Sequence, residues 1–416
     1  MTPVLRDSQD DSLQLTDSEV VNELEYSRLP QNLITSLTLL EGCEDDALWS
    51  VTNGVIADNT TAGEFVQGAQ SIKVTTNAGV TANFNRAGIS WALAYPERDF
   101  CFWYYCHDYA NFQYSQLQLG QGGDVVNRAY AYPEKHDGWN LIRLLQDDLT
   151  LAGAFSWDTL VDYCRLRVTP QVAVQANLSC DYFFSSLRRP ALVITFDDWS
   201  PTVYTIAYDY MNARHAKGTF YVTTDQVDGV NRISLAQLTE MNNAGWDIAN
   251  HTDDHTDLTT VAQVVAQAHL ADAKTALDGW GFTRASNHVA YPGGAYNDTV
   301  VAAMVAENML TGRTVVNDRY PVLPFDQPYR IELGQSFGNT LTLAAAKTWL
   351  DGVVSRDEIG IALFHSLVVA PANLSEWGID DFKAFIDYAV SLNIPIITIS
   401  ELYALQSGSV MVRMPG

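Results

Sequence analysis

The chain has 416 residues, a formal net charge of −25 and a pI near 4.4. Its length suffices for about two or three domains, and a hydrophobic share of 47% with a charged share of 18% is typical of folded globular proteins. The acidity excludes nucleic acid as an expected partner, because phosphate binding draws on clustered Lys and Arg. Membrane insertion is not expected either, since no stretch approaches the roughly 18 apolar residues of a spanning helix.

Residues 1 to 38 form an acidic, polar segment with one short apolar patch, NLITSLTLL. The segment has neither a basic region nor an apolar region of the kind found in a secretory signal peptide. We interpret residues 1–38 as an N-terminal arm that could attach the protein to a neighbour, with an unstructured terminus as the equal alternative.

Residues 39–189 have the sequence texture of an all-β domain. Short alternating runs such as SIKVTTN, DFCFWYYCHDY and DYCRLRVT are separated by Gly, Asn and Asp turns. This spacing predicts a two-sheet sandwich of jelly-roll kind, which would bind carbohydrate or position the rest of the chain. Aromatic residues are dense here, and we expect most of them in the core rather than on a sugar-binding face: Phe100, Phe102, Trp103, Tyr104, Tyr105 and Tyr109.

The five cysteines all precede Ala191, and none lies in a CxxC pair. We interpret them as buried thiols and leave one disulfide open, so they do not fix the redox compartment.

Residues 190–416 alternate apolar strands with helical patterns, which predicts a parallel sheet closed into a distorted (β/α) barrel. The expected strands are ALVITF, GTFYVTT, GWDIAN, HVAYP, IGIALFH and IPIITIS. The expected helices cover residues 202–215, 234–244, 264–280, 298–309 and 380–392.

Polar residues follow the carboxyl ends of these strands, where barrel enzymes place their active sites. ALVITF leads into Asp197 and Asp198, GWDIAN into His251 and His255, and IGIALF into His365. The HxxxH spacing lets one helical turn or a tight loop point both imidazoles the same way. With one carboxylate they form a set that leaves coordination positions open on a divalent metal. The alternatives are solvated loop histidines and helix-capping aspartates.

These motifs resemble the polysaccharide deacetylases of carbohydrate esterase family 4, the NodB-homology domain. TFDDW resembles the first motif, HTDDHTDL matches the His-Ser/Thr-x-x-His-x-x-Leu second motif, AYPGG resembles the third and LFH the Leu-x-His fifth. The resemblance covers Ala191 to about Leu405. It implies a metal-dependent hydrolase that removes acetyl groups from a polysaccharide.

Carried over by position, the resemblance assigns a role to each motif residue. Asp198, His251 and His255 would bind the metal, Asp197 would act as the general base and His365 as the general acid. The resemblance also places five residues beside the reacting group or the sugar. Gly293 would donate its backbone N–H to the oxyanion, Leu363 would line the acetyl pocket, Tyr291 and Pro292 would contact substrate, and Trp199 would overhang the groove or pack beside it.

Two departures from the family pattern stand out. HVAYPGG lacks the arginine that often opens the third motif and orients the base, and we expect Arg330 to substitute for it. The fourth motif, Asp-x-x-Asp-Trp, is not recognisable between Thr311 and Leu350, so the partner of His365 is not identified. Zinc is the default metal, and cobalt, nickel and manganese also suit such ligands.

The expected substrate is a bacterial cell-surface polysaccharide, and a neutral glycan or one that becomes cationic on deacetylation fits the acidic chain. One alternative is a glycan-binding structural or adhesive protein without turnover, and another is a hydrolase of a small cyclic amide or ureide. The expected location is extracellular or on a phage virion. The N-terminal region would then attach the protein to the virion or to further copies of the chain.

Overall fold

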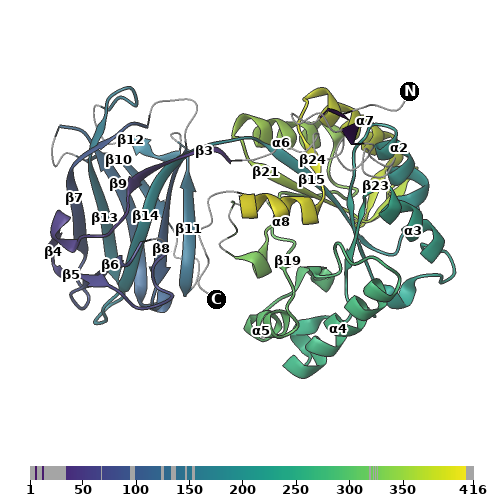
Figure 1. Ribbon diagram of the computed structural model, residues 1–416, viewed down its shortest axis with the longest axis horizontal. Coiled ribbons are helices and arrows are strands. Elements are labelled where there is room, and N and C mark those ends of the chain that lie inside the picture. Colours follow the sequence, from purple (N-terminus) through teal and green to yellow (C-terminus); the bar gives the residue numbers. More distant parts are fainter. Residues whose placement is uncertain are drawn as a thin grey trace.

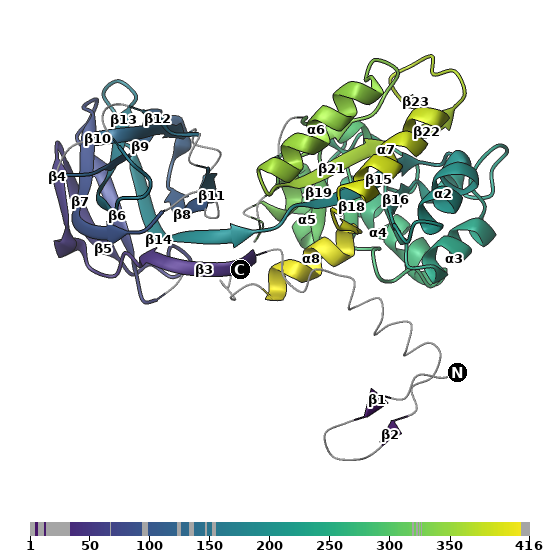
Figure 2. The same cartoon turned by 90° about the horizontal axis from the view of Figure 1, so that it is seen from above.

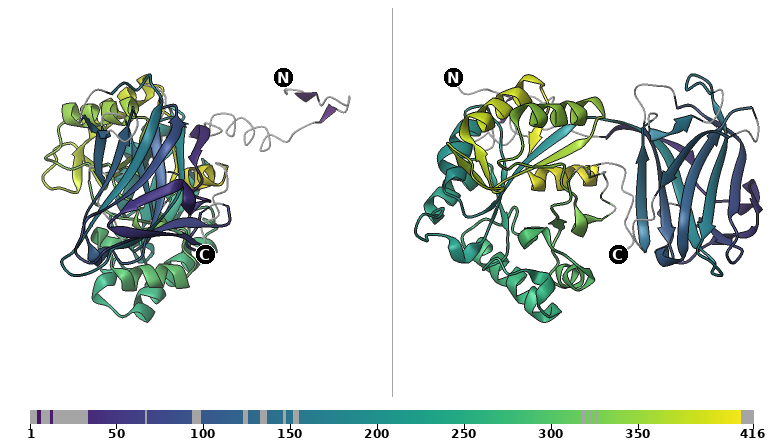
Figure 3. Two further views of the ribbon diagram at one scale, coloured as in Figure 1. Left: turned by 90° about the vertical axis from the view of Figure 1, so that its left-hand side faces the viewer. Right: turned by 180° about the vertical axis from the view of Figure 1, so that it is seen from behind.

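A computed structural model describes the protein over residues 5–6, 12–13, 34–66, 68–93, 99–122, 126–132, 137–145, 148–151, 155–317, 320–321, 323, 325 and 327–408. Figure 1 shows an all-β part at one end and an α/β part at the other, and the right-hand view of Figure 3 shows the same separation from behind. β14 (Asn177–Arg188) ends the first part and β15 (Ala191–Asp198) opens the second. Figure 2 shows these two strands in succession along the molecule.

Most of the predicted N-terminal arm lies outside the described residues. Two short strands are described there, β1 (Leu5–Arg6) and β2 (Ser12–Leu13), which pair antiparallel. β3 (Ile34–Glu41) pairs with β14, so residues 34–38 belong to a sheet and not to the arm. The reason is the alternating apolar patch, which has strand periodicity and finds a partner strand only in the folded chain.

The all-β part consists of two six-stranded sheets whose strand pairs are antiparallel. One sheet has the order β12-β10-β9-β13-β7-β4, and the other has the order β11-β8-β14-β6-β5 with β3 on β14. Two 3-10 turns, η1 (Asp46–Leu48) and η2 (Tyr109–Asn111), lie between strands. The strands are β4 (Trp49–Thr52), β5 (Gly54–Asn59), β6 (Ser71–Thr76), β7 (Ala82–Trp91), β8 (Asp99–Cys106), β9 (Phe112–Gly120), β10 (Val126–Tyr132), β11 (Gly138–Leu144), β12 (Thr150–Leu151) and β13 (Val161–Pro170).

One hydrophobic core joins the two sheets, because Phe84 and Leu166 of the first sheet pack in the same cluster as Phe102 and Phe183 of the second. The chain therefore forms a two-layered sandwich here, and the jelly-roll topology stays a prediction. Of the six aromatics singled out in the sequence, four are buried and Tyr105 is half-buried, whereas Tyr109 is exposed. All five cysteines are buried thiols. Burial raises the pKa of the Cys43 and Cys164 thiols.

The α/β part is built on an eight-stranded sheet in which every pair is parallel. Its order is β19-β18-β17-β16-β15-β21-β20, with β24 on β15. No ladder joins the outer strands β19 and β20 within the described residues, so the sheet forms a barrel-like half shell. The strands are β16 (Thr219–Val222), β17 (Asp247–Asn250), β18 (His288–Ala290), β19 (Thr311–Arg313), β20 (Gln335–Ser336), β21 (Ile359–Phe364) and β24 (Ile396–Ile397).

Helices cover the outside of this sheet, as Figure 2 shows. The first predicted helix begins as a π-helix, η4 (Val203–Tyr208), and continues as α2 (Asp209–Asn212). Side-chain caps mark several helix starts. Ser234 forms a capping box with Gln237 at the start of α3 (Leu235–Asn243), and Asn297 caps α5 (Asp298–Ala306). The remaining helices are α3 (Leu235–Asn243), α4 (Gln263–Gly279), α5 (Asp298–Ala306), α6 (Leu343–Ser355), α7 (Ile379–Ser391) and α8 (Ile399–Gly408).

Several short segments complete the α/β part. A separate parallel pair consists of β22 (Ser366–Val368) and β23 (Glu376–Gly378). The 3-10 turns are η5 (Thr224–Gln226), η6 (Leu258–Thr260), η7 (Pro292–Gly294) and η8 (Pro328–Arg330). None of the helices in the described part of the chain is long and apolar enough to cross a membrane.

Candidate metal centre

The two aspartates of TFDDW end β15 at the carboxyl edge of the parallel sheet, and they point to different surroundings. Asp197 is buried, whereas Asp198 is partly exposed. Asp198 has a φ of 77°, in the left-handed region that few residues other than glycine adopt. Its carbonyl accepts a hydrogen bond from the Thr223 N–H at 3.1 Å. This turn ends the strand and separates the two carboxylates.

The two histidines lie in a tight loop after β17, not on a helix. Thr252 and His255 both have positive φ, 63° and 72°. The Thr252 N–H donates to Asn250 Oδ1 at 2.8 Å, and the His255 N–H donates to Thr252 Oγ1 at 3.0 Å. These bonds fold the loop back on itself, so the His251 and His255 rings lie 4.9 Å apart between centroids.

A third histidine holds this loop from outside. His269 of α4 lies with Nδ1 2.6 Å from Asp253 Oδ1 and 3.4 Å from Asp254 Oδ1. Together these three residues form a second group whose ligand atoms could surround a cation. His269 and Asp253 already pair with each other, and this contact fixes the segment between His251 and His255.

Asp198, His251 and His255 converge as a candidate ligand set. Asp198 Oδ1 lies 3.3 Å from Nε2 of each histidine, and the three residues could hold one metal ion. His251 Nδ1 lies 2.8 Å from the Ala290 carbonyl oxygen, which only accepts. The proton must therefore lie on Nδ1, and this leaves the lone pair of Nε2 directed at Asp198, as metal-binding histidines require. The donor set fits a divalent metal.

The carboxylate of Asp198 and the imidazole of His255 shift each other's pKa. Burial raises the pKa of Asp198, but the imidazoles of His251 and His255 that face its carboxylate outweigh burial and hold that pKa well below its usual range. The hydrogen bond to Asp198 raises the pKa of His255, against the effect of burial. An anionic carboxylate facing two imidazoles is the arrangement that a cation would complete.

Asp197 is held by Arg313, a residue that the sequence analysis did not single out. The Arg313 guanidinium donates to both carboxylate oxygens of Asp197, and both side chains are buried. Asp197 Oδ2 also lies 4.0 Å from His251 Nε2. The carboxylate is therefore fixed beside the ligand set. The position of Arg313 at the end of a strand that follows α5 was the available signal, because the β-α alternation requires a strand there.

The expectation for Arg330 is wrong. Arg330 donates to Asp298 at 2.6 Å and lies over the Tyr296 ring at 5.4 Å, away from Asp197. It belongs to η8, whereas Arg313 ends β19, the strand next to the one that carries the third motif. Strand order rather than sequence distance decides which arginine reaches the base.

His365 follows β21, which pairs with β15, so Phe364 lies opposite Phe196 and His365 leaves the sheet at the same edge as Asp197. Its side chain is half-buried, and its charge lowers the pKa of Asp198 through space. His365 Nδ1 is buried and has no hydrogen-bond partner. The partner that the sequence did not reveal is thus also absent from the described residues.

The third motif divides into an exposed glycine and buried neighbours. Gly293 is exposed with a φ of 62°, a conformation that favours glycine. Tyr291 is a core residue and not a substrate contact: its side chain is fully buried, and its hydroxyl donates to the Tyr329 carbonyl at 2.8 Å. Pro292 is also buried, so its predicted contact with substrate is not supported either. Apolar packing against Val289 and Val300 retains Tyr291 in the core.

Trp199 and Leu363 were also singled out. Trp199 is half-buried and meets the His255 ring edge-on, with centroids 5.9 Å apart. Leu363 is buried among Val193, Ala290 and Leu333. Trp199 therefore lies beside the ligand set, and the contact of Leu363 with an acetyl group stays a prediction.

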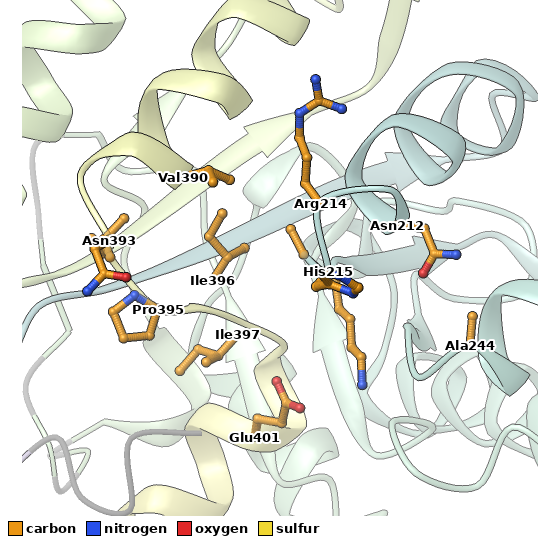
Figure 4. A pocket seen from close by; sticks show the side chains of 13 residues that line it. Asn212, Arg214, His215, Ala244, Val390, Asn393, Pro395, Ile396, Ile397 and Glu401 are labelled. Atoms are coloured by element: carbon orange, nitrogen blue, oxygen red, sulfur yellow. The ribbon is translucent and has the colours of Figure 1, made fainter. Parts of the chain in front are cut away.

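Figure 4 shows the side chains that line a pocket of about 250 Å³ in the α/β part. Its lining includes Ala216 and Lys217, which precede β16, together with Ile396 and Ile397 of β24. Because parallel strands begin at one edge and end at the other, this pocket lies at the opposite edge of the sheet from Asp197 and His251.

Fold and site together define a class: an α/β domain that presents two histidines and an aspartate, with a second aspartate beside them, at the carboxyl edge of a parallel sheet. Residues 185–310 match the family model described as polysaccharide deacetylase. This stretch, which contains the first three motifs, is therefore similar to the polysaccharide deacetylases that its motifs resemble.

Individual relatives match parts of the chain. YxkH of Bacillus subtilis strain 168, a protein named as a polysaccharide deacetylase, is 29% identical over 112 residues, which are 27% of this chain and 40% of YxkH. The Streptococcus pyogenes deacetylase PplD, solved in complex with acetate, is 27% identical over 34% of this chain and 63% of its own, with a TM-score of 0.30. A family 4 carbohydrate esterase from Streptomyces lividans is 15% identical over 51% and 94%, with a TM-score of 0.37. This chain thus spans less than two thirds of the first two relatives.

Proposed function

We propose that the α/β domain is a metal-dependent deacetylase that hydrolyses acetyl groups of a polysaccharide, with zinc as the metal. One observation carries the proposal: Asp198 Oδ1 lies 3.3 Å from Nε2 of both His251 and His255, while Asp197 is fixed beside them by Arg313. Nitrogen and carboxylate ligands suit zinc and also accept cobalt, nickel or manganese. Asp198, His251 and His255 would hold the ion.

The side chains around the ligand set supply the proton transfers. A bound divalent metal would supply Lewis acidity, which acidifies a water molecule and polarises the acetyl carbonyl. Asp197 accepts the proton of the attacking water, and Arg313 keeps the carboxylate oriented for this step. The N–H of Gly293 donates to the developing oxyanion. His365 then protonates the leaving amine or alkoxide, so the reaction ends with acetate and a deacetylated sugar.

The decisive experiment measures acetate released by the full chain, loaded with zinc, from a polymer of N-acetylhexosamine. We expect Asp197→Asn to lower turnover by at least about 100-fold, since it cannot accept the proton, and to retain zinc because Asp197 is not in the ligand set. Asp298→Asn, which changes an exposed aspartate paired with Arg330, is the matched control and should leave turnover unchanged.

Three results would contradict the proposal in different ways. Full acetate release by Asp197→Asn would exclude this residue as the base. Hydrolysis of a small cyclic ureide without acetate release from any glycan would identify a small-molecule hydrolase. Tight glycan binding without any turnover would identify a binding protein.

We also propose that the protein acts on a bacterial cell-surface glycan, outside the cell or on a phage virion. The substrate class supports this location, because such polymers lie outside the cytoplasm. The β-sandwich would then position the catalytic domain or bind the polymer. Detection of the protein in purified virions or in a culture supernatant supports the proposal, and its confinement to host cytosol contradicts it.

A further inference from the structure

A stacked arginine and tryptophan lie at the rim of the candidate metal centre. Trp199 directly follows Asp198, and its ring edge meets His255. The guanidinium carbon of Arg232 lies 4.5 Å from the centroid of the Trp199 ring, within the range of a cation–π contact. Arg232 therefore brings a positive charge close to a residue that touches the ligand set.

The loop that carries Arg232 is tied to Trp199 and to itself. The Ile233 N–H donates to the Trp199 carbonyl at 3.0 Å, and the Asp228 N–H donates to the Ile233 carbonyl at 3.0 Å. Asp228 Oδ1 accepts from the Leu235 N–H, also at 3.0 Å. These bonds fix the loop between η5 and α3. The guanidinium is thus held in place before any ligand arrives, which lowers the entropy cost of binding.

Arg232 has no acidic partner among the described residues, and this sets it apart from the other arginines that are described in its domain. Six arginines are described between Ala191 and Gly408, and each of the other five forms an ion pair: Arg214 with Asp387, Arg284 with Asp247, Arg313 with Asp197, Arg330 with Asp298 and Arg356 with Glu358. With the residues that the structure describes, Arg232 forms no ion pair within 4.0 Å, and it contacts an aromatic face instead. In a chain with a net charge of −25, Arg232 places a positive charge beside the candidate metal centre.

We propose that Arg232 binds an anionic group of the glycan next to the acetylated sugar, so that the substrate is an acidic, acetylated polysaccharide. The proposal rests on the deacetylase function proposed above and narrows its substrate class. A guanidinium matches the geometry of a carboxylate with two parallel hydrogen bonds, and its stacking on Trp199 leaves the N–H groups at its edge free to donate. A carboxylate of an acidic sugar is the ligand of first choice.

This substrate class differs from the neutral or cationic glycan that the overall charge favoured. The overall charge acts weakly at the site, because salt screens exposed charges beyond a Debye length of about 8 Å. An arginine in direct contact with the substrate acts over less than that length. Local charge therefore decides which glycan binds.

The test compares one polymer in two forms: an N-acetylhexosamine and hexuronic acid copolymer, and the same copolymer with its carboxyl groups reduced to alcohols. We expect zinc-loaded wild-type protein to deacetylate the acidic form with a kcat/KM about tenfold higher, the size of one charge-assisted contact at a partly exposed site. The difference should lie in KM and shrink as salt is raised. Arg232→Gln should abolish the difference in KM between the two forms.

Arg232→Lys should keep part of the preference, since it retains the charge but not the paired donors. Arg214→Gln is the matched control: Arg214 also stacks on an aromatic ring, Tyr210, but contributes to the pocket at the other edge of the sheet (Figure 4). It should keep the full preference. Equal rates of the wild type on both polymers, or an unchanged preference in Arg232→Gln, would overturn the proposal.

Failure of this proposal can be separated from failure of the proposed function. If no polymer releases acetate, the binding of both copolymers to the protein is measured directly. Stronger binding of the acidic form, lost in Arg232→Gln, supports the anion site. Equal binding of the two forms overturns it. A phosphodiester-containing N-acetylhexosamine polymer forms the third arm. If the protein prefers this polymer to the uronic acid copolymer, the result would support the anion site and assign the anion as phosphate.

Discussion

At the scale of single residues, the buried pair of Arg313 and Asp197 sets the geometry of the candidate site. The guanidinium contacts both carboxylate oxygens, and a lysine could not reproduce this paired contact. We therefore expect Arg313→Lys to lower kcat by about 10- to 100-fold through misplacement of Asp197, with zinc affinity nearly unchanged. Acetate-release kinetics and zinc titration measure the two effects separately.

Arg330→Lys is the control for this comparison, because Arg330 pairs with an exposed aspartate away from the site. It should retain kcat. An Arg313→Lys protein with wild-type kcat would show that Asp197 needs no fixed orientation, and the role of Arg313 would then be structural only.

His255 supplies one of the three candidate ligands, and its removal tests the ligand set without touching Asp197. His255→Ala leaves one imidazole and one carboxylate, too few protein ligands for a tight zinc site. We expect less than about 0.1 zinc per chain after dialysis, as measured by elemental analysis. His215→Ala, which changes an exposed histidine in the pocket at the other edge, should keep full zinc content.

At the scale of elements, β18 contributes a buried histidine that makes stability depend on pH. Burial lowers the pKa of His288 from 6.5 to about 4, while His288 Nδ1 lies 2.8 Å from Thr311 Oγ1 of β19. In the unfolded chain His288 takes up a proton near pH 6.5, whereas in the folded chain it is protonated only near pH 4. Stability is therefore full above pH 6.5 and falls as the pH drops toward 4, by about 3 kcal/mol in all.

Thermal unfolding measured between pH 7 and 4 checks this expectation. His288→Asn, which removes the titrating group and keeps a polar side chain beside Thr311, should show a shallower fall over the same interval. An identical pH profile for the two proteins would mean that His288 does not contribute to acid sensitivity.

At the scale of the whole molecule, a cluster of charges joins the β-sandwich to the α/β domain. Arg143 of β11 donates to the Arg356 carbonyl at 2.9 Å and lies 3.9 Å from Glu358. Arg356 in turn pairs with Asp148 of the sandwich at 3.2 Å. Burial raises the pKa of Glu358, although both arginines lower it. Its carboxylate therefore depends on nearby positive charge to stay ionised in the interface.

Arg143→Met should weaken this junction, because Glu358 then keeps only the partly exposed Arg356 as partner. We expect a loss of about 2 kcal/mol in the free energy of unfolding and two separate transitions in calorimetry, one for each domain. Arg214→Met, which removes an exposed ion pair within one domain, should change stability by at most about 0.5 kcal/mol. A single unchanged transition for Arg143→Met would show that the junction is held by other contacts.

The sequence by itself indicated most strands and helices of the α/β part and the strand ends at which Asp197, Asp198, His251 and His365 lie, but not β20, α6 or α8. These features follow from local periodicity, which a single stretch of chain contains. The sequence analysis also missed β19 and with it Arg313, because the residues of this strand, TGR, contain no apolar run. It also predicted that Tyr291 faces the substrate, although apolar packing holds the ring in the core.

Only the tertiary structure decided which distant residues meet. The contact between Asp197 and Arg313 spans 116 positions, and it depends on the order in which β15 to β19 pair across the sheet. The same holds for Arg232, whose loop reaches Trp199 only once β15 and β16 lie side by side. Sequence periodicity specifies which face of an element is buried, whereas strand order and packing specify its neighbours. That is the physical reason why the candidate ligands could be located from the sequence, whereas the supporting residues could not.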